Sequence, residues 1–144
     1  MKPIREVLQI KGQETWSVTP DTPVYDALKL MAEKNVGALL VLDGDNLAGI
    51  LSERDYARKV ILKGKASKDT PVGEIMSEKV VCVTPEQSVA DCMALMTDKH
   101  FRHLPVIEDG KLVGVISIGD VVKAVISEQK FVIEQLEHYI AGDL

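Results

Sequence analysis

Two stretches of the sequence carry the same spacing of glycine, serine and aspartate, G-x-x-S-x-x-D, at residues 49–55 and 114–120. The start of a helix after a strand offers unpaired backbone N–H groups and the positive end of the helix dipole, so a serine there can help bind a phosphate. A carboxylate three residues later can accept both hydrogens of a ribose 2′,3′-diol. Since a nucleoside monophosphate presents both groups, the pattern predicts nucleotide binding by Ser52, Asp55, Ser117 and Asp120.

The same spacing also has a purely structural interpretation. Ser-x-x-Asp before an apolar helix is a capping box, in which the serine is the N-cap and the acid occupies the third helical position. Because a duplicated helix needs its cap twice, duplication alone does not decide between a cap and a ligand site.

Both motifs belong to a longer internal repeat. The segment V-T-P-D-T-P-V, starting at Val18, aligns without a gap with V-T-P-E-Q-S-V, starting at Val83, and the same offset superimposes the two G-x-x-S-x-x-D motifs. A duplicated unit predicts that the fold and the site each occur twice. Each half would be marginal as an independent domain, so we expect the halves to share one core.

Each repeat is predicted to run strand, helix, strand, strand, helix. The first strands end at Thr19 and Thr84, and Asp21 or Glu86 is expected in the first turn of the helix that follows. Apolar runs flanking Asp-Gly predict a hairpin in each repeat, and Pro105 marks its strand as an edge or a strand start. The predicted domains are residues 5–66, 67–127 and a C-terminal amphipathic helix at 128–144, which either closes the core or forms a dimer seam.

Composition excludes several classes of protein. The 144 residues are 46% hydrophobic and 27% charged, with a net charge of −5 that disfavours a nucleic-acid surface. No apolar run is long enough to span a membrane and the N-terminus lacks a secretory signal, so we expect a cytoplasmic protein. Cys82 and Cys92 form no CxxC motif, and Cys92 with His100 and His103 makes a poor ligand set, so no metal is predicted.

The V-x-T-P openings, the R-H-L-P-V-I segment and the paired G-x-x-S-x-x-D motifs together resemble a pair of cystathionine-β-synthase (CBS) domains. The stretches L-A-G-I-L-S-E-R-D-Y-A-R-K and Q-L-E-H-Y-I-A-G are similar to small stand-alone CBS-pair proteins of bacteria and plant organelles. The resemblance implies an α/β (α+β) Bateman module, in which tandem β-α-β-β-α repeats are related by a pseudo-two-fold axis and form two clefts between them.

The resemblance further implies adenine nucleotides as ligands, with AMP first and ADP, NAD, ATP or S-adenosylmethionine as alternatives. The family places phosphate and ribose on the serine and aspartate of each motif and adds contacts from the loop before the middle strand and from residues before the first strand. Those positions here are Val36, Gly37, Ala38, Phe101, Arg102, His103, Thr15 and Val80.

The two copies differ around the shared motif. The guanidinium of Arg54 can bind a phosphate through two hydrogen bonds, whereas Gly119 at the matching position lets a ligand approach the backbone closely. In the loop before the middle strand it is the second repeat that carries the positive charge, because Arg102 matches Gly37 of the first repeat. We therefore predict two non-equivalent sites. The alternative is that Arg102 and His103 are ordinary surface residues; Trp16 and Phe101 are expected in the core rather than as base-stacking platforms.

No sequence motif supports catalysis, since a P-loop, a nucleophile elbow and a dinucleotide-binding glycine pattern are all missing. The sequence predicts a non-catalytic regulatory module without a catalytic cofactor, and the resemblance adds a homodimer with an unidentified regulated partner. The alternative is a constitutive interaction scaffold with vestigial nucleotide sites.

Overall fold

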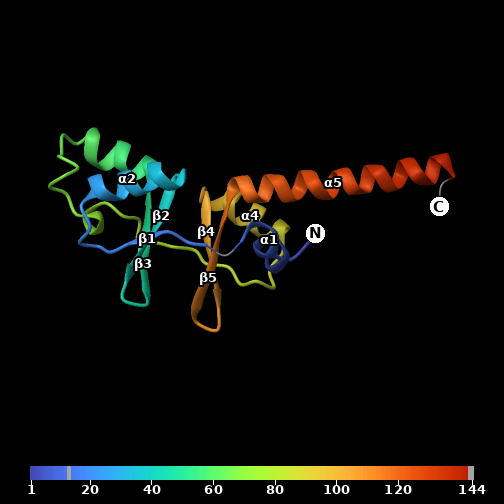
Figure 1. Cartoon of the computed structure of the whole chain (residues 1–144), viewed down its shortest axis with the longest axis horizontal. Helices are drawn as coiled ribbons and strands as arrows, with labels where there is room; N and C mark the ends of the chain where they lie inside the picture. Colours follow the sequence, from blue (N-terminus) through green and yellow to red (C-terminus); the bar gives the residue numbers. More distant parts are fainter. Residues whose placement is uncertain (13, 143–144) are drawn as a thin grey trace. The chain divides into compact units, whose positions relative to one another are not determined.

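The computed structural model describes residues 1–12 and 14–142, which form two compact mixed α/β units. The first-repeat unit comprises residues 14–80, and the second-repeat unit comprises residues 1–13 together with 81–144. Both units are drawn in Figure 1.

The first-repeat unit is a three-stranded sheet with helices. The two-residue strand β1 pairs in parallel with β2, and β2 forms an antiparallel hairpin with β3. Helix α2 buries Val24, Ala27 and Met31 at the helical spacing predicted from the sequence. The elements are β1 (Ser17–Val18), α2 (Val24–Lys34), β2 (Ala38–Asp43), β3 (Asn46–Ser52), α3 (Glu53–Tyr56), the π-helical turn η1 (Ala57–Ile61) and the 3₁₀ turn η2 (Val72–Glu74).

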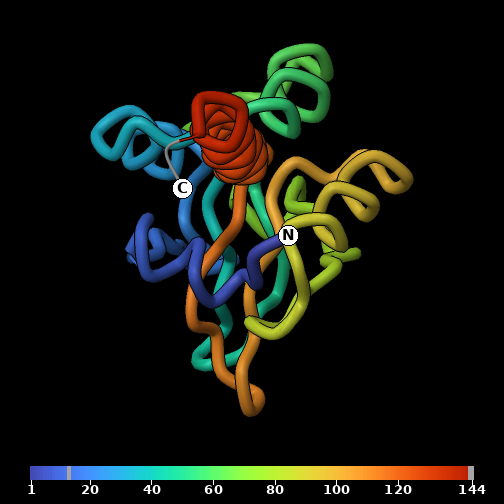
Figure 2. Tube along the Cα trace, turned by 90° about the vertical axis from the view of Figure 1, so that its right-hand side faces the viewer, coloured from blue at the N-terminus to red at the C-terminus, as the bar shows by residue number. Residues whose placement is uncertain are grey.

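The second-repeat unit is built around the β4–β5 hairpin, seen in orange in Figure 2, which leads into the last helix. Its turn has Asp109 and Gly110 at positive φ (52° and 76°), as a tight hairpin turn requires. The elements are α1 (Ile4–Lys11), α4 (Val89–Lys99), β4 (His103–Glu108), β5 (Lys111–Ser117) and α5 (Ile118–Ala141).

The first strand expected to end at Thr84 is reduced to one bridge, between Val83 and Val106. In the first repeat the matching strand is held by a hydrogen bond from Leu40 N to Trp16 O (3.1 Å). The residue 65 positions after Leu40 is Pro105, which has no N–H to donate. Pro105 is a buried residue within β4, which is an edge strand of the two-stranded β4–β5 sheet as predicted; it is not the strand start, and it shortens the neighbouring strand.

The compact units are not the sequence repeats, because each takes up the segment that precedes the other repeat. Helix α1 is joined to the second repeat by hydrogen bonds from Ile4 N to Gln87 O (2.8 Å) and from Val89 N to Lys2 O (3.1 Å). The segment before the second repeat is joined to the first by Val24 N to Thr70 O (2.8 Å). The boundaries predicted at 5–66 and 67–127 thus follow the repeats but not the compact units.

Each unit has its own hydrophobic core, contrary to the single shared core that was expected. Ile4, Val7 and Leu8 complete the core of the second-repeat unit, and Val72 and Ile75 complete that of the first. A unit buries more apolar surface than one repeat alone would, because it also takes up a preceding segment.

Helix α5 runs without a break from Ile118 to Ala141, so the helix predicted at 128–144 is the second half of a longer one. Residues 143 and 144 lie outside the described residues. In Figure 1 α5 extends well past the hairpin of its own unit. Its C-terminal half does not close the core, because Leu136, Tyr139 and Ile140 are 56%, 71% and 83% exposed. Within the described part of the chain, no helix is long and apolar enough to cross a membrane.

Candidate functional site

The hairpin register brings the predicted site segments together within each unit. Ala38, the first residue of β2, lies opposite Ser52, the last residue of β3. His103 lies opposite Ser117 in the same way at the equivalent end of β4 and β5. Each serine is therefore next to the loop that enters the middle strand of its own repeat.

A backbone hydrogen bond fixes each of these loops to the start of the helix. Glu53 N donates to Gly37 O (3.0 Å), and Ile118 N donates to Arg102 O (2.9 Å). The first N–H of each helix is consequently used by the protein itself, so fewer N–H groups remain for an anion than the sequence alone suggested.

Ser52 and Ser117 are N-caps within full capping boxes. Asp55 N donates to Ser52 Oγ (3.1 Å), and Ser52 N donates to Asp55 Oδ2 (3.0 Å). Asp120 N donates to Ser117 Oγ (3.2 Å), and Ser117 N donates to Asp120 Oδ2 (2.8 Å). The structural interpretation of Ser-x-x-Asp is thus correct for both motifs.

A third capping box, at the start of α4, provides an internal comparison. Asp91 N donates to Ser88 Oγ (3.1 Å), and Ser88 N donates to Asp91 Oδ2 (3.0 Å). The first turn of this helix therefore contains Asp91 rather than the expected Glu86. In the two candidate sites, unlike this one, the serine Oγ also lies 3.0 or 2.9 Å from the carboxylate Oδ2 of Asp55 or Asp120.

In the first-repeat unit, the second carboxylate oxygen of Asp55 has two further neighbours. Ser77 Oγ donates to Asp55 Oδ1 (3.3 Å), and Lys59 Nζ lies 3.3 Å from the same oxygen. Lys59 is one helical turn after Asp55, and Ser77 comes from the segment that pairs with Ile50 of β3. This aspartate is thus contacted from its own helix and from the segment after η2.

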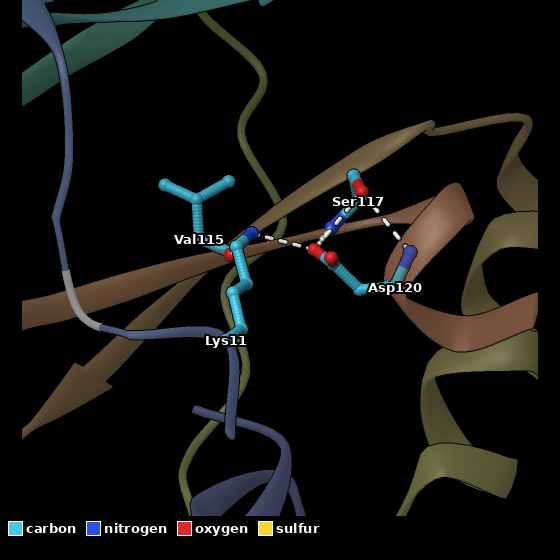
Figure 3. A network of polar contacts seen from close by, with 4 residues as sticks. All are labelled: Lys11, Val115, Ser117 and Asp120. Atoms are coloured by element: carbon cyan, nitrogen blue, oxygen red, sulfur yellow. Dashed lines mark hydrogen bonds and ion pairs between the residues drawn. The ribbon is translucent and has the colours of Figure 1, made fainter. Parts of the chain in front are cut away.

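In the second-repeat unit, Lys11 contacts Asp120, as Figure 3 shows. Its Nζ donates to Asp120 Oδ2 (2.5 Å) and to the carbonyl oxygen of Val115. Partial burial acts to raise the pKa of Asp120, but hydrogen bonds from Lys11 and Ser117 and the positive charge of Lys11 outweigh it and hold the pKa below its ordinary value. Asp120 is therefore an ionised carboxylate at neutral pH.

Lys11, Lys59 and Ser77 were missed in the sequence analysis. Lys59 could have been identified as an i+4 ion pair with Asp55. The positions of the other two follow from the repeat, in which the apolar pair Val7 and Ile10 matches Val72 and Ile75. Lys11 comes directly after the first pair, and Ser77 comes two residues after the second. The pattern does not show that the segment carrying each pair joins the opposite repeat, which is what brings these side chains to the aspartates.

The three glycines near the motifs serve different purposes. A Cβ on Gly49 would lie 2.6 Å from the carbonyl oxygen of Ser77, and one on Gly114 would lie 2.7 Å from Leu8 Cδ2. The leading glycine of each motif is therefore required for packing. Gly119 is different, because a Cβ there would meet only Ser117 Oγ at an ordinary 3.6 Å.

The other predicted residues divide by exposure. Gly37, Arg54 and Arg102 are exposed, whereas Val36, Ala38 and His103 are half-buried. Burial, together with the nearby charges of Lys11 and Arg102, lowers the pKa of His103 against the opposing effect of Asp120. Its imidazole is thus neutral at pH 7, where it can accept as well as donate a hydrogen bond.

Two aromatic residues and two flanking residues complete the predicted set. Phe101 packs against the core of its unit, and so does Trp16, whose ring lies 4.3 Å from the ammonium of Lys34. Thr15 and Val80 are half-buried at the two ends of the first-repeat unit. Among the described residues, no hydrogen bond joins Thr15 to Ser52 or Asp55.

The cysteines and acidic residues form no further centre. Cys92 is buried, and burial with the charge of Asp91 raises its pKa to about 11; Cys82 is exposed and its pKa is raised by partial burial. Across residues 1–12 and 14–142, no group of three His, Cys, Asp or Glu residues could hold a metal ion.

Comparison with known proteins identifies the repeats. The CBS domain family model matches residues 4–62 and 72–127. The CBS domain-containing protein CBSX3, mitochondrial, of Arabidopsis thaliana is 48% identical over 96% of this chain and 72% of its own. A solved CBS-domain protein from Burkholderia ambifaria MC40-6 is 55% identical with a TM-score of 0.86, covering 89% of this chain and 96% of that one. A hexameric CBS-CP12 protein from bloom-forming cyanobacteria is 32% identical with a TM-score of 0.74, and the match covers 85% of this chain and 70% of that one.

Proposed function

Because the chain belongs to the CBS domain family, we propose that it is a non-catalytic regulatory module that binds adenine nucleotides. AMP is the first candidate, and NAD and ATP are the next. Binding is read out as a change in conformation or association by a protein partner still to be identified, and we place the protein in the cytoplasm. A nucleotide can shift partner affinity only as far as it binds the two states differently.

One observation carries the proposal. In both units a serine hydroxyl, a carboxylate and the loop entering the middle strand are brought to one corner by the hairpin register and by a hydrogen bond from the first helical N–H. The third capping box, at Ser88 and Asp91, lies at the start of α4 instead of at the end of a hairpin. A helix cap needs only the serine and the aspartate. The loop placed beside them at these two corners adds groups that can contact a ligand.

The two oxygens of each aspartate have different tasks. In both sites Oδ2 accepts the backbone N–H of the serine and belongs to the cap. In Asp120, Oδ1 has no hydrogen-bond partner among the described residues, whereas in Asp55 it lies 3.3 Å from Ser77 Oγ and Lys59 Nζ. We assign Oδ1 of both aspartates to the hydroxyl groups of the ribose diol. At Asp55 the ribose hydroxyls have to displace Ser77 Oγ and Lys59 Nζ from this oxygen.

The residues around the aspartates make the two sites unequal. Arg54 is exposed beside Asp55 and can bind phosphate through two parallel hydrogen bonds. At the matching position, neither packing nor a positive φ requires Gly119 to be a glycine, and this supports a role in close ligand approach. In the second-repeat unit we assign the phosphate to exposed Arg102, next to neutral His103.

The test is calorimetric titration of Asp55→Ala and Asp120→Ala with AMP, ATP and NAD. Asp91→Ala is the matched control, because it removes the same capping contact outside the candidate sites. Loss of one aspartate should weaken one binding event at least tenfold, since a hydrogen bond to a charged group contributes about 1.5–3 kcal/mol. We expect Asp91→Ala to bind as the wild type does.

Two outcomes would contradict the proposal. If none of the three nucleotides binds or raises the melting temperature, the scaffold alternative is favoured, because a ligand at 100 times its dissociation constant stabilises by about 2.7 kcal/mol. If all three variants weaken binding equally, the aspartates act only as caps. Equal losses for every nucleotide at Asp55 and Asp120 would refute the inequality of the sites.

A further inference from the structure

Helix α5 carries a seven-residue repeat of apolar residues from Val122 to Ile140. Val122, Val125 and Ile126 occur with the same spacing as Gln129, Val132 and Ile133, and again as Leu136, Tyr139 and Ile140. Taking Val122 as position a, these residues fill positions a, d and e of three consecutive heptads. Such a sustained repeat is the pattern by which helices pair along their length.

We name the seven exposed members of this repeat the α5 stripe. Their exposed fractions range from 50% for Val122 and Val132 to 83% for Ile140. The members are Val122, Ile126, Val132, Ile133, Leu136, Tyr139 and Ile140. Taking roughly 200 Å² for a free side chain of this size, the stripe presents on the order of 800 Å², which is what each partner buries in a standard protein interface.

A groove of about 300 Å³ opens beside the stripe. It is lined by Met1, Val125, Glu128, Gln129, Val132 and Ile133, so on the helix it follows a, d and e positions together with Glu128 at a g position. Holes between side chains of one helix receive the a and d side chains of the other in a paired structure.

The composition of the helix favours a second copy of this chain as the occupant. The stripe contains no charged residue, while Lys130, Glu134 and Glu137 lie at b and f positions on the other side. A stripe of uniform apolar character over three heptads is complementary to itself, and one polar residue at an a position, Gln129, suits a role in fixing register. A cationic or anionic partner would have no matching charge to contact on this stripe.

We propose that the α5 stripe pairs with the same stripe of a second copy, forming a helix–helix dimer interface along α5 from Val122 to Ile140. This goes beyond the proposed nucleotide function and does not depend on it. The residues involved are remote in sequence from Ser52 and Asp55, and they begin after Asp120 on the same helix.

The test is sedimentation equilibrium of the full chain with the stripe variant Ile133→Asp plus Leu136→Asp. The matched control is Ser127→Asp plus Lys130→Asp, which places the same new residues on the opposite side of the same exposed helix. We expect a wild-type dimer, an unchanged control, and a dimer dissociation constant at least 100-fold higher for the stripe variant. Circular dichroism and nucleotide titration of the stripe variant check that its units remain folded.

Each other outcome overturns the proposal. A dimer that persists in the stripe variant places the interface elsewhere, and a wild-type monomer at all concentrations shows that copies do not pair. Unaltered nucleotide binding alongside either of these results leaves the proposed function intact.

Discussion

Replacing Lys11 with methionine tests how the second-repeat unit holds Asp120. Methionine keeps the apolar stem of lysine but removes the ammonium that donates to Asp120 Oδ2 (2.5 Å) and to the carbonyl oxygen of Val115. The lysine side chain is 32% exposed and the aspartate 17%, so the pair lies between a surface ion pair and a buried one. We expect Lys11→Met to lower the free energy of unfolding by about 1–1.5 kcal/mol, between the typical values for exposed pairs and for charged hydrogen bonds.

The effect should depend on pH in a defined direction. The pKa of Asp120 is lower in the folded protein than its ordinary value of 3.8, so its stabilising contribution is complete above about pH 4. It is lost as the pH falls through the lower pKa of the folded state, because the carboxyl then becomes neutral. The difference in stability between wild type and Lys11→Met should therefore be full at pH 7 and shrink below pH 3.8.

The assay is a double-mutant cycle of Lys11→Met and Asp120→Asn, followed by thermal and urea unfolding. A loss of 1 kcal/mol corresponds to about 4 °C in melting temperature for a chain of this size. We expect a coupling energy of about 1 kcal/mol at pH 7. A coupling below about 0.4 kcal/mol, which is the usual error of additivity, or a difference that persists unchanged at pH 3, would refute the assignment.

Three further predictions concern packing, titration and thiol reactivity. Gly49→Ala should lower the free energy of unfolding by about 1–3 kcal/mol, measured by urea unfolding, because the new Cβ meets a backbone carbonyl. Gly119→Ala should keep the wild-type stability and weaken only nucleotide binding, measured by calorimetry. His103 should titrate below pH 6.5 in an NMR pH series, and a midpoint above 6.5 would contradict this. Because the unfolded state binds the proton at a higher pH than the folded state, the free energy of unfolding should fall as the pH drops below 6.5. Exposed Cys82 should react with a thiol reagent well before buried Cys92, whose pKa is about 11, and two equal rates in the folded protein would be the opposite result.

The local elements could be predicted from the sequence because their signals lie within a few residues of one another. The helical spacing of Val24, Ala27 and Met31 and the Asp-Gly turns lead directly to α2 and to both hairpins. The shortened strand at Val83 was also within reach, since Pro105 cannot donate the hydrogen bond that Leu40 donates in the other repeat. Ser88 and Asp91 likewise carry a readable capping signal.

What the sequence did not reveal depends on contacts between distant segments. Helix α1 packs with the second repeat, 80 or more residues away, and only this packing brings Lys11 to Asp120. Similarly, Ser77 reaches Asp55 because its segment pairs with Ile50. No periodicity in a single repeat specifies which of two similar units a preceding segment joins, so the neighbours of the aspartates required the structure.

The proposed site and the proposed interface share one element. Helix α5 starts with the Ser117–Asp120 cap and continues without interruption to Ala141. If a nucleotide binds at the cap and a second copy binds at the stripe, any coupling must be reciprocal, so AMP would shift dimerisation by the factor by which dimerisation shifts AMP affinity.

The most direct test of the central claim compares AMP with its 2′,3′-dideoxy analogue in the wild type, in Asp120→Ala and in Asp55→Ala. The claim is that the aspartates accept the ribose hydroxyls. We predict that the wild type binds AMP at least tenfold more tightly than the analogue, and that replacing the aspartate of a site abolishes this preference at that site. If the preference remains in the variants, or if the wild type binds both nucleotides equally, the carboxylates do not contact the ribose and the assignment of the sites is wrong.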